Sequence, residues 1–383
     1  MKKTSVMAYY FPNWHPTPMN DEWHGKDWTE WEVVKSAVPR YEGHDQPKIP
    51  VWGYEDEADV KVMEKKIAFA KENGLDGFIW DWYWFNEGPY RRECLDNAFL
   101  KAKNNKDLKF SVMWCNHDPI NVHPASYAVV KNKMTKLLDG HITKETFIEG
   151  TDYCIKNYFN RENYLRIDGK LYFTIFGTQM LIESFGGLQE CRAMLDDFRD
   201  RVRKAGLGEI NIATNAYTIY TGDVASTDGN SMFDKAFEIG KKAGFDSAFV
   251  HNNLSDGKNS FPFMKYDDVK DYAFITNDEM QAAAEKNGMG FYPSTTVGWD
   301  TSPRIVPSDK LENIGYPFNS MIDDSTPEKF EKWLRMNKEF CDKHNTPLLS
   351  VFAFNEWTEG GYLEPDKTWG DGYIKAFKRV FGD

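Results

Sequence analysis

The sequence has 383 residues, of which 41% are hydrophobic and 15% aromatic, including 13 Trp and 19 Tyr. This composition supplies enough apolar side chains for a large core and leaves aromatic rings available for a binding cleft. The formal net charge of −12 at pH 7 argues against nucleic acid and anionic membranes as partners, because both would be repelled over most of the surface. A neutral ligand is therefore expected.

The cysteines indicate reduced thiols rather than a disulfide framework. The five residues are scattered through the chain and form no CxxC pair; they are Cys94, Cys115, Cys154, Cys191 and Cys341. Their odd number and wide spacing favour free thiols in the core over disulfides or a structural zinc site.

The N-terminus begins with Lys2 and Lys3, which imitate the start of an export signal. The apolar segment that follows is too short for such a signal, because it continues at once into Tyr9 and Tyr10 as a first strand. The expected compartment is the cytoplasm, or the periplasm or the exterior if a leader has been removed. No stretch of the sequence approaches the length of a membrane helix, so no transmembrane segment is expected.

Strand and helix patterns alternate along the whole chain. Apolar runs predict strands at 5–11, 76–85, 109–116, 171–176, 210–217, 246–250, 290–297 and 348–354. Amphipathic patterns predict helices near 56–73, 91–104, 144–158, 189–205, 232–243, 266–286, 327–343 and 370–380. Eight strand–helix pairs without a linker, a repeat or a change in composition favour one (β/α)8 TIM barrel with long βα loops over a doubly wound sheet. We therefore expect residues 1–383 to form a single α/β domain.

The last predicted strand ends in two carboxylates. An apolar run over 348–354 stops at 355–359, Asn-Glu-Trp-Thr-Glu, before two glycines. In parallel α/β barrels the carboxyl ends of the strands carry the chemistry. A separation of three residues can aim Glu356 and Glu359 into one cleft, as a reaction with one acid and one base requires. The alternative is that this segment caps the next helix or pairs with lysines.

Aromatic and polar residues at other strand ends suggest the walls of a sugar-binding cleft. Asp81, Tyr83 and Trp84 end the second strand, where rings can stack on sugars and a carboxylate can accept hydrogen bonds from hydroxyls; core packing is the alternative. The Trp-rich loop after the first strand is a binding element or a lid. The predicted glycan-binding residues are Tyr10, Trp28, Glu30, Trp31, Asp81, Tyr83, Trp84, Asn116, His117, Asn215, Tyr217, His251, Asn252, Trp299, Asn355 and Trp357. Those at strand ends should converge on the carboxyl-terminal mouth of the barrel.

Metal and nucleotide sites are not indicated by the sequence. His15, His117 and His251 fall near predicted strand ends, but the chain contains no His-x-His or His-Glu-x-x-His spacing. No glycine-rich run follows the dinucleotide-binding or the P-loop pattern. Neither a metal nor a cofactor is therefore expected.

Six motifs, distributed from the first strand to the last, resemble those of the WbsX-like proteins, which are grouped with glycoside hydrolase family 99; they lie at 9–16, 28–31, 43–47, 74–78, 83–86 and 355–365. The resemblance implies a (β/α)8 barrel that acts on glycans without a metal. Family 99 hydrolases are retaining endo-α-mannosidases whose paired glutamates match Glu356 and Glu359 of this sequence. By that resemblance Glu356 is the base, which helps the 2-hydroxyl of the substrate attack the anomeric carbon, and Glu359 is the acid.

The leading hypothesis is a retaining glycoside hydrolase that acts on an oligo- or polysaccharide. One alternative is a sugar-nucleotide glycosyltransferase of polysaccharide biosynthesis, because some WbsX-like proteins carry that label. A transferase would need a diphosphate site, for which the acidic pairs at 21–22 and 323–324 are poor candidates. The third hypothesis is a non-catalytic glycan-binding barrel, which would have no use for two adjacent acids.

Overall fold

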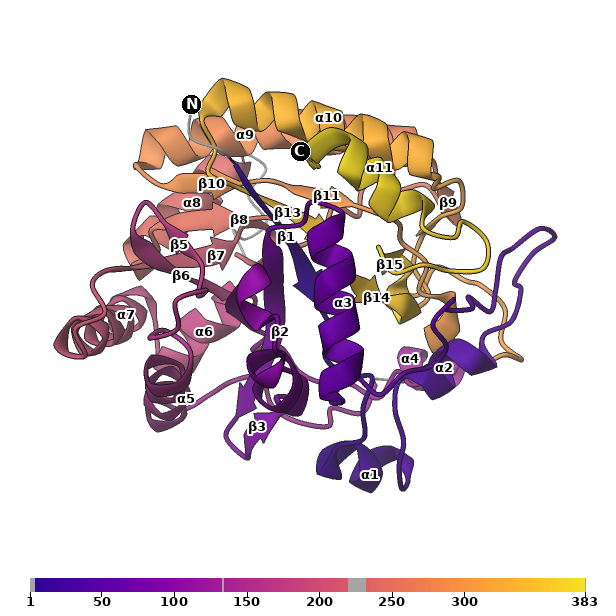
Figure 1. The fold of residues 1–383 in the computed structure, drawn as a ribbon, viewed down its shortest axis with the longest axis horizontal. Helices are drawn as coiled ribbons and strands as arrows, with labels where there is room; N and C mark the ends of the chain where they lie inside the picture. The colour runs from indigo at the N-terminus through magenta and orange to yellow at the C-terminus, as the bar shows by residue number, and fades with distance from the viewer. Residues whose placement is uncertain (1–3, 133, 220–231, 383) are drawn as a thin grey trace.

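The computed structural model describes residues 4–132, 134–219 and 232–382 (Figure 1). Within them, nine parallel strands form the central sheet in the order β10-β8-β7-β6-β4-β2-β1-β13-β11. Their bounds are β1 Ser5–Tyr10, β2 Gly77–Phe85, β4 Lys109–Trp114, β6 Lys170–Ile175, β7 Ile210–Asn215, β8 Ser247–Phe249, β10 Gly290–Tyr292, β11 Ser294–Thr296 and β13 Leu348–Phe352. Nearly all of their residues are buried, as expected of parallel strands that are covered on both faces.

The sheet closes into a barrel through a strand that is divided at Pro293. The strand predicted at 290–297 consists of β10, which pairs with β8, and β11, which pairs with β13. Proline has no backbone N–H and cannot act as a donor in the ladder. Its carbonyl oxygen still accepts a hydrogen bond from the Ser350 N–H at 3.1 Å. The predicted single-domain (β/α)8 barrel is therefore confirmed, with its seventh strand in two pieces.

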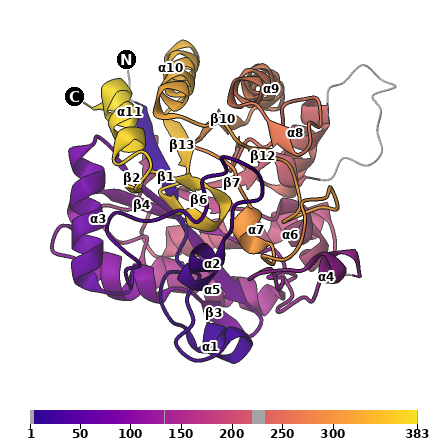
Figure 2. The same cartoon turned by 90° about the vertical axis from the view of Figure 1, so that its right-hand side faces the viewer.

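Helices cover the outside of the barrel (Figure 2). Their bounds are α3 Val60–Glu72, α5 Lys144–Asn157, α6 Thr178–Phe185, α7 Leu188–Lys204, α8 Met232–Ala243, α9 Tyr266–Asn287, α10 Pro327–His344 and α11 Gly372–Phe381. The sequence determines where α10 begins: the Thr326 hydroxyl accepts a hydrogen bond from the Lys329 N–H, and Pro327 occupies the first turn. Among the described residues, no helix combines the length and the apolar character needed to cross a bilayer.

The helix predicted at 91–104 is wrong. That segment forms a π-helical turn, Cys94–Ala98, followed by a short 3₁₀ turn. Tertiary contacts override the local helical pattern, because the Asp96 carboxylate accepts hydrogen bonds from the hydroxyls of Tyr153 and Tyr158, each at 2.6 Å. A helix that the sequence pattern did not predict, α6, also precedes α7.

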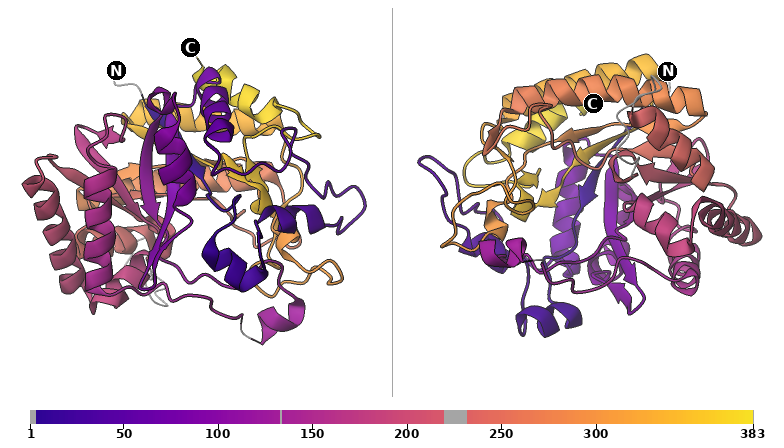
Figure 3. Two further views of the ribbon diagram at one scale, coloured as in Figure 1. Left: turned by 60° about the horizontal axis from the view of Figure 1, so that its bottom comes forward. Right: turned by 180° about the vertical axis from the view of Figure 1, so that it is seen from behind.

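Long loops gather at the carboxyl-terminal end of the barrel (Figure 3). They contain the short elements α1 Pro18–His24, α2 Trp31–Ser36, β3 Gly88–Tyr90, α4 Tyr127–Lys131, β9 Phe263–Met264, β12 Met321–Ile322, β14 Asn355–Glu356 and β15 Gly361–Tyr362. The indigo loop after β1 and the orange loop after β11 lie on the same side of the molecule in both views. Barrels of this kind carry their active sites at this end.

One apolar core runs through the inside of the barrel and the layer between the strands and the helices. All five cysteines belong to this core, and all are buried and unpaired, which confirms the prediction of reduced core thiols. Their burial raises the pKa of each thiol above its ordinary value, so they are suited to packing rather than to reaction.

Candidate active site

A cavity of about 330 Å³ lies at the carboxyl-terminal end of the barrel. Eight of the predicted catalytic or binding residues line it: Asp81, Tyr83, His117, His251, Asn252, Trp299, Glu356 and Glu359. They come from β2 and from the segments that follow β4, β8, β11 and β13. The fold therefore brings together residues from five strand ends in a space that is large enough for a small ligand.

The two glutamates are placed by a short hairpin that follows β13. The Asn355 side chain ties this hairpin to the end of β1, because its amide donates to the Phe11 carbonyl at 2.9 Å and its oxygen accepts from the Phe11 N–H at 2.8 Å. Glu356 then ends β14, and a 3₁₀ turn over Trp357–Glu359 follows. Side chains three residues apart are eclipsed in a 3₁₀ turn, so Glu356 and Glu359 both reach the cavity.

Gly360 lets the 3₁₀ turn end against a neighbouring loop. Its φ of 70° is a left-handed conformation that favours glycine. A Cβ at this position would lie 2.9 Å from the backbone nitrogen of Asp300. That nitrogen donates a hydrogen bond to the Glu359 carbonyl at 2.7 Å. The hairpin is thereby fixed to the loop that follows β11.

Arg304 lies between the two glutamates. Its guanidinium is 3.0 Å from the Glu359 carboxylate and 3.8 Å from that of Glu356. The Tyr316 hydroxyl accepts a hydrogen bond from Arg304 and donates one to Glu359, the latter at 2.8 Å. Glu359 is therefore held by two donors, whereas Oε2 of Glu356 has no hydrogen-bond partner among the described residues.

Glu30 is the buried counter-ion of Arg304. The two side chains are 2.9 Å apart, and Glu30 also accepts hydrogen bonds from Asn13 and Thr358. Burial by itself would raise the pKa of Glu30, but Arg304 and His123 outweigh that effect and lower the pKa to about 2. Glu30 does not line the cavity; it is a permanently charged support for the arginine that does.

Burial raises the pKa of the carboxyl groups in the cavity. The pKa of Glu356 is well above its usual range because of burial and the neighbouring charge of Glu359. Burial also raises the pKa of Glu359, although Arg304 and the hydrogen bond from Tyr316 oppose the rise. The pKa of Asp81 is raised by burial and by the charge of Glu359. Such a pair can supply one protonated and one ionised carboxyl group near neutral pH.

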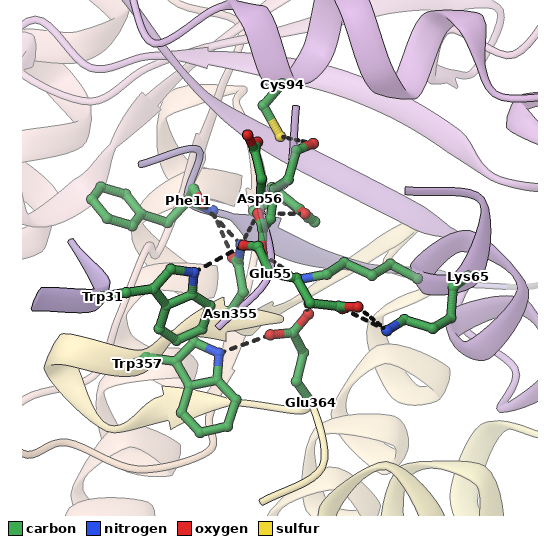
Figure 4. A network of polar contacts seen from close by, with 12 residues as sticks. Phe11, Trp31, Glu55, Asp56, Lys65, Cys94, Asn355, Trp357 and Glu364 are labelled. Atoms are coloured by element: carbon green, nitrogen blue, oxygen red, sulfur yellow. Dashed lines mark hydrogen bonds and ion pairs between the residues drawn. The ribbon is translucent and has the colours of Figure 1, made fainter. Parts of the chain in front are cut away.

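A buried ion cluster supports the glutamate hairpin from behind (Figure 4). Lys66 of α3 contacts the carboxylates of both Glu57 and Glu364. Trp357 donates its indole N–H to Glu364 at 2.7 Å, and Asn355 donates to Glu57 at 3.1 Å. The lysine and both carboxylates are almost completely buried. The cluster therefore fixes Asn355 and Trp357 of the hairpin to a helix on the outside of the barrel.

Two predicted binding residues, Tyr10 and Trp84, face away from the cavity. Side chains alternate along a strand, and Tyr83 lines the cavity, so Trp84 lies on the opposite face and packs against Tyr153 of α5. Tyr10 donates its hydroxyl to Glu57 at 2.6 Å and so belongs to the ion cluster.

The remaining predicted binding residues do not line the cavity; they are Trp28, Glu30, Trp31, Asn116, Asn215, Tyr217, Asn355 and Trp357. Asn116, for example, holds the backbone N–H of Gly177 at 2.7 Å and its carbonyl at 2.8 Å. Trp28 packs against His24, which does line the cavity, with ring centroids 4.2 Å apart. Tyr217 is 43% exposed. A strand-end position brings a residue near the mouth, but it does not determine which way the side chain turns.

Several cavity residues with polar side chains were not predicted, among them Arg91, His123, Arg304 and Tyr316. They lie in loops where no strand or helix period marks an inward position. The sequence does place Arg304 in the loop that follows the seventh strand, close to Trp299, and this position could have indicated a cavity residue. No local pattern distinguishes Tyr316, which reaches Glu359 only through the path of a long loop.

One group of possible metal ligands occurs in the described part of the chain, formed by Asp118, Asp139 and His141. Asp118 also lines the cavity. The Lys136 ammonium lies 2.9 Å from Asp118 and 3.3 Å from Asp139. Its positive charge offsets part of the charge of the two carboxylates and lies where a cation would bind, which makes the group a poor site for a divalent ion.

Chelation is therefore expected to leave enzymatic activity unchanged. Initial rates on a cleaved glycan, measured before and after dialysis against EDTA, should agree within error. Loss of activity in EDTA that a divalent ion restores would contradict this prediction and would direct attention to Asp118, Asp139 and His141.

Comparison with known proteins identifies relatives along the whole chain. The family model described as Glycosyltransferase WbsX matches residues 6–377. The uncharacterized protein WxcX of Xanthomonas campestris pv. campestris is 24% identical over 396 residues, an alignment that covers 98% of this chain and 49% of that protein. The chain thus spans about half the length of this curated relative.

Two solved structures share the fold over nearly their whole length. The GH99 endo-alpha-mannosidase from Bacteroides thetaiotaomicron has a TM-score of 0.62 and 14% identity, with 99% of this chain and 97% of that chain covered. A protein described as glycoside hydrolase-like has a TM-score of 0.64 and 15% identity, with 100% and 95% covered. The barrel is therefore glycoside hydrolase-like in fold.

Proposed function

The chain belongs to the family described as Glycosyltransferase WbsX, and we propose that it is a retaining glycoside hydrolase that acts on an oligo- or polysaccharide. The observation that carries the proposal is the pair Glu356 and Glu359, which share one cavity and have pKa values raised by burial. Glycoside hydrolysis requires two such carboxyl groups, one as acid and one as base or nucleophile. The likeness in fold to an endo-α-mannosidase supports a glycan as the substrate.

In the proposed mechanism Glu359 is the acid and Glu356 is the base. Glu359 donates its proton to the leaving oxygen while Glu356 accepts the proton of the substrate's 2-hydroxyl, whose oxygen attacks the anomeric carbon. The product of this step is an anhydro sugar and a free leaving group. Water then opens the anhydro sugar, with Glu359 accepting a proton from the water and Glu356 returning one to the 2-oxygen. Two displacements at one carbon retain its configuration.

Substrate binding has a specific effect on this pair. In the free protein Arg304 and Tyr316 stabilise the charge of Glu359, so the shared proton is favoured on Glu356. A substrate hydroxyl that donates to the unpartnered Oε2 of Glu356 stabilises the ionised form of that group. The proton is then available to Glu359, where the leaving oxygen needs it.

A sugar-nucleotide glycosyltransferase is the second candidate, because the family is described by that name. A nucleotide diphosphate needs several positive charges or a bound cation. Arg304, however, is already paired with Glu30 and Glu359, so Arg91 is the one arginine among the described lining residues without an ion pair. The cavity also contains four carboxyl groups, those of Asp81, Asp118, Glu356 and Glu359. This surrounding favours a glycan over a diphosphate.

The test is a screen of the native protein against plant, host and bacterial polysaccharides, in parallel with sugar nucleotides. We expect release of new reducing ends from at least one polysaccharide and no consumption of any sugar nucleotide. Proton NMR of the first product should show the anomeric configuration of the starting bond. Transfer from a sugar nucleotide without hydrolysis would refute the proposal, and an inverted first product would refute its mechanism.

Replacement of Arg304 should shift the pH dependence of activity upward. Arg304 lowers the pKa of both Glu356 and Glu359, so both pKa values rise in Arg304→Met. Both limbs of the profile of kcat/KM against pH should therefore move to higher pH. Arg304→Lys keeps the charge and should stay closer to the native profile. A methionine variant with an unshifted profile would show that the arginine does not control these groups.

A further inference from the structure

Arg91 is a buried arginine that lines the cavity and forms no ion pair with the described residues. Two arginines line the cavity within the described ranges, Arg91 and Arg304. Arg304 forms ion pairs with Glu30 and Glu359. The guanidinium of Arg91 has no carboxylate of the described residues within 4.0 Å, and its Nε has no hydrogen-bond partner among them.

The groups in closest contact with the Arg91 guanidinium are aromatic rings, whereas Glu30 and Asp81 act on its charge from beyond ion-pair distance. Its guanidinium lies 4.3 Å from the ring centroid of Tyr90, 5.0 Å from that of Tyr83 and 5.1 Å from that of Phe11. Only 8% of the residue is exposed. Ring faces attract a cation, but they offset only part of the cost of removing its charge from water.

The backbone at Arg91 is also in an unusual conformation. Its φ of 58° lies in the left-handed region, which non-glycine residues other than Asn and Asp seldom adopt. The next residue, Arg92, has an ordinary environment: it is near Asp96, at 3.8 Å, and near the ring of Tyr153. The chain thus adopts a strained conformation at the arginine that reaches the cavity, which is common at binding sites.

We infer that the ligand of this cavity carries an anionic group and that Arg91 binds it. A buried charge without a close counter-ion is costly, and Arg91 lines the cavity, so an anionic group of a ligand bound there can supply the missing partner. The inference deepens the proposed function, on which it rests, by making the substrate an acidic glycan. It differs from the neutral ligand expected from net charge, because a total of −12 describes the whole chain and does not determine the charge around one buried cation.

The site favours an anion with a single charge. Arg304 is already compensated, and burial keeps the nearby His123 neutral by lowering its pKa to about 3. The ionised member of the Glu356 and Glu359 pair in the same cavity would repel a second negative charge. A uronic acid carboxylate or a sulfate monoester meets this requirement, and the planar guanidinium can hold either through two parallel hydrogen bonds.

Binding by the native protein tests the inference independently of turnover. Uronic acid polysaccharides are compared with their carboxyl-reduced forms, and sulfated polysaccharides with their desulfated forms, by calorimetric titration. We expect one acidic form to bind about 10- to 100-fold more tightly than its neutral counterpart, the scale of a hydrogen bond to a charged group. Whether the carboxylate or the sulfate pair shows the difference identifies the anion. Equal affinity within every pair, or binding of neutral forms alone, would overturn the inference.

Arg91→Met should abolish this preference, whereas the neighbouring Arg92→Met should preserve it. Because Arg91 is an unpaired buried charge, its replacement by methionine should not lower the melting temperature. A lower melting temperature with an unchanged preference would show that Arg91 has a structural role only. Preferential binding of an acidic glycan without release of reducing ends would support the role of Arg91 and refute the proposed hydrolase activity. Release of reducing ends from neutral glycans, without any preference for acidic ones, would support the hydrolase and refute the role of Arg91.

Discussion

Glu359→Gln is expected to lose roughly 10²-fold or more in kcat on a glycan, the usual scale for a positioned proton-transfer group. The same variant should retain much more activity on an activated aryl glycoside, because a good leaving group needs little protonation. Glu356→Gln should lose activity on both substrates alike, because the 2-hydroxyl must be deprotonated whatever the leaving group. Comparison of kcat/KM on the two substrates for each variant measures the difference.

The controls for these variants separate catalysis from structure. Glutamine has the shape of glutamate, so the melting temperature and the affinity for the glycan should stay close to the native values. Glu32→Gln, on the exposed side of α2, is the matched substitution away from the cavity and should be fully active. If the activated aryl glycoside restored the activity of Glu356→Gln and not that of Glu359→Gln, Glu356 would be the acid and Glu359 the base. Loss of binding with normal turnover would remove both residues from catalysis.

Lys66→Met is expected to lower the free energy of unfolding by about 3–5 kcal/mol, the cost of leaving a buried charge without its partner. The substitution leaves the buried carboxylates of Glu57 and Glu364 without a cation. Because Glu57 and Glu364 hold Asn355 and Trp357 of the hairpin, activity should fall as well. Urea unfolding at neutral pH measures the loss of stability.

The neighbouring Lys65 provides the control, and pH provides a second test. Lys65 pairs with Glu55 near the surface, so Lys65→Met should cost within about 1 kcal/mol. Burial raises the pKa of Glu57 from 4.5 to about 7, so the folded protein binds a proton that the unfolded chain has released, and stability falls as pH rises between these values. Loss of Lys66 raises that pKa further, so the defect should be smaller at pH 5 than at pH 8. An equal defect at both pH values would contradict this account of the cluster.

Much of the fold was predictable because each strand is a buried apolar run and each helix has a regular polar face. The division of the seventh strand follows from Pro293. The proline is visible in the sequence, but its effect depends on the strands that pair on either side of it. The π-helical turn Cys94–Ala98 was not predictable, because its cause is the contact of Asp96 with two tyrosines that lie more than 50 residues away.

The candidate site was predictable where its residues are neighbours in the sequence. Glu356 and Glu359 could be identified because three residues separate them and a strand end precedes them. Trp84 shows the limit of that approach: it is adjacent to Tyr83, but the alternation of the strand turns it to the other face. Arg304 and Arg91 belong to irregular loops, so only the folded structure brings them to the cavity.

The most direct test of the central claim is the source of the oxygen in the product. A polysaccharide that yields reducing ends is incubated with the native protein in ¹⁸O-water, and the fragments are analysed by mass spectrometry. Hydrolysis by Glu356 and Glu359 predicts one ¹⁸O atom at each newly formed anomeric carbon, no excess incorporation in a reaction without protein, and almost none with Glu359→Gln. Fragments that form without ¹⁸O, or product that forms only when a sugar nucleotide is added, would contradict the assignment of this barrel as a glycoside hydrolase.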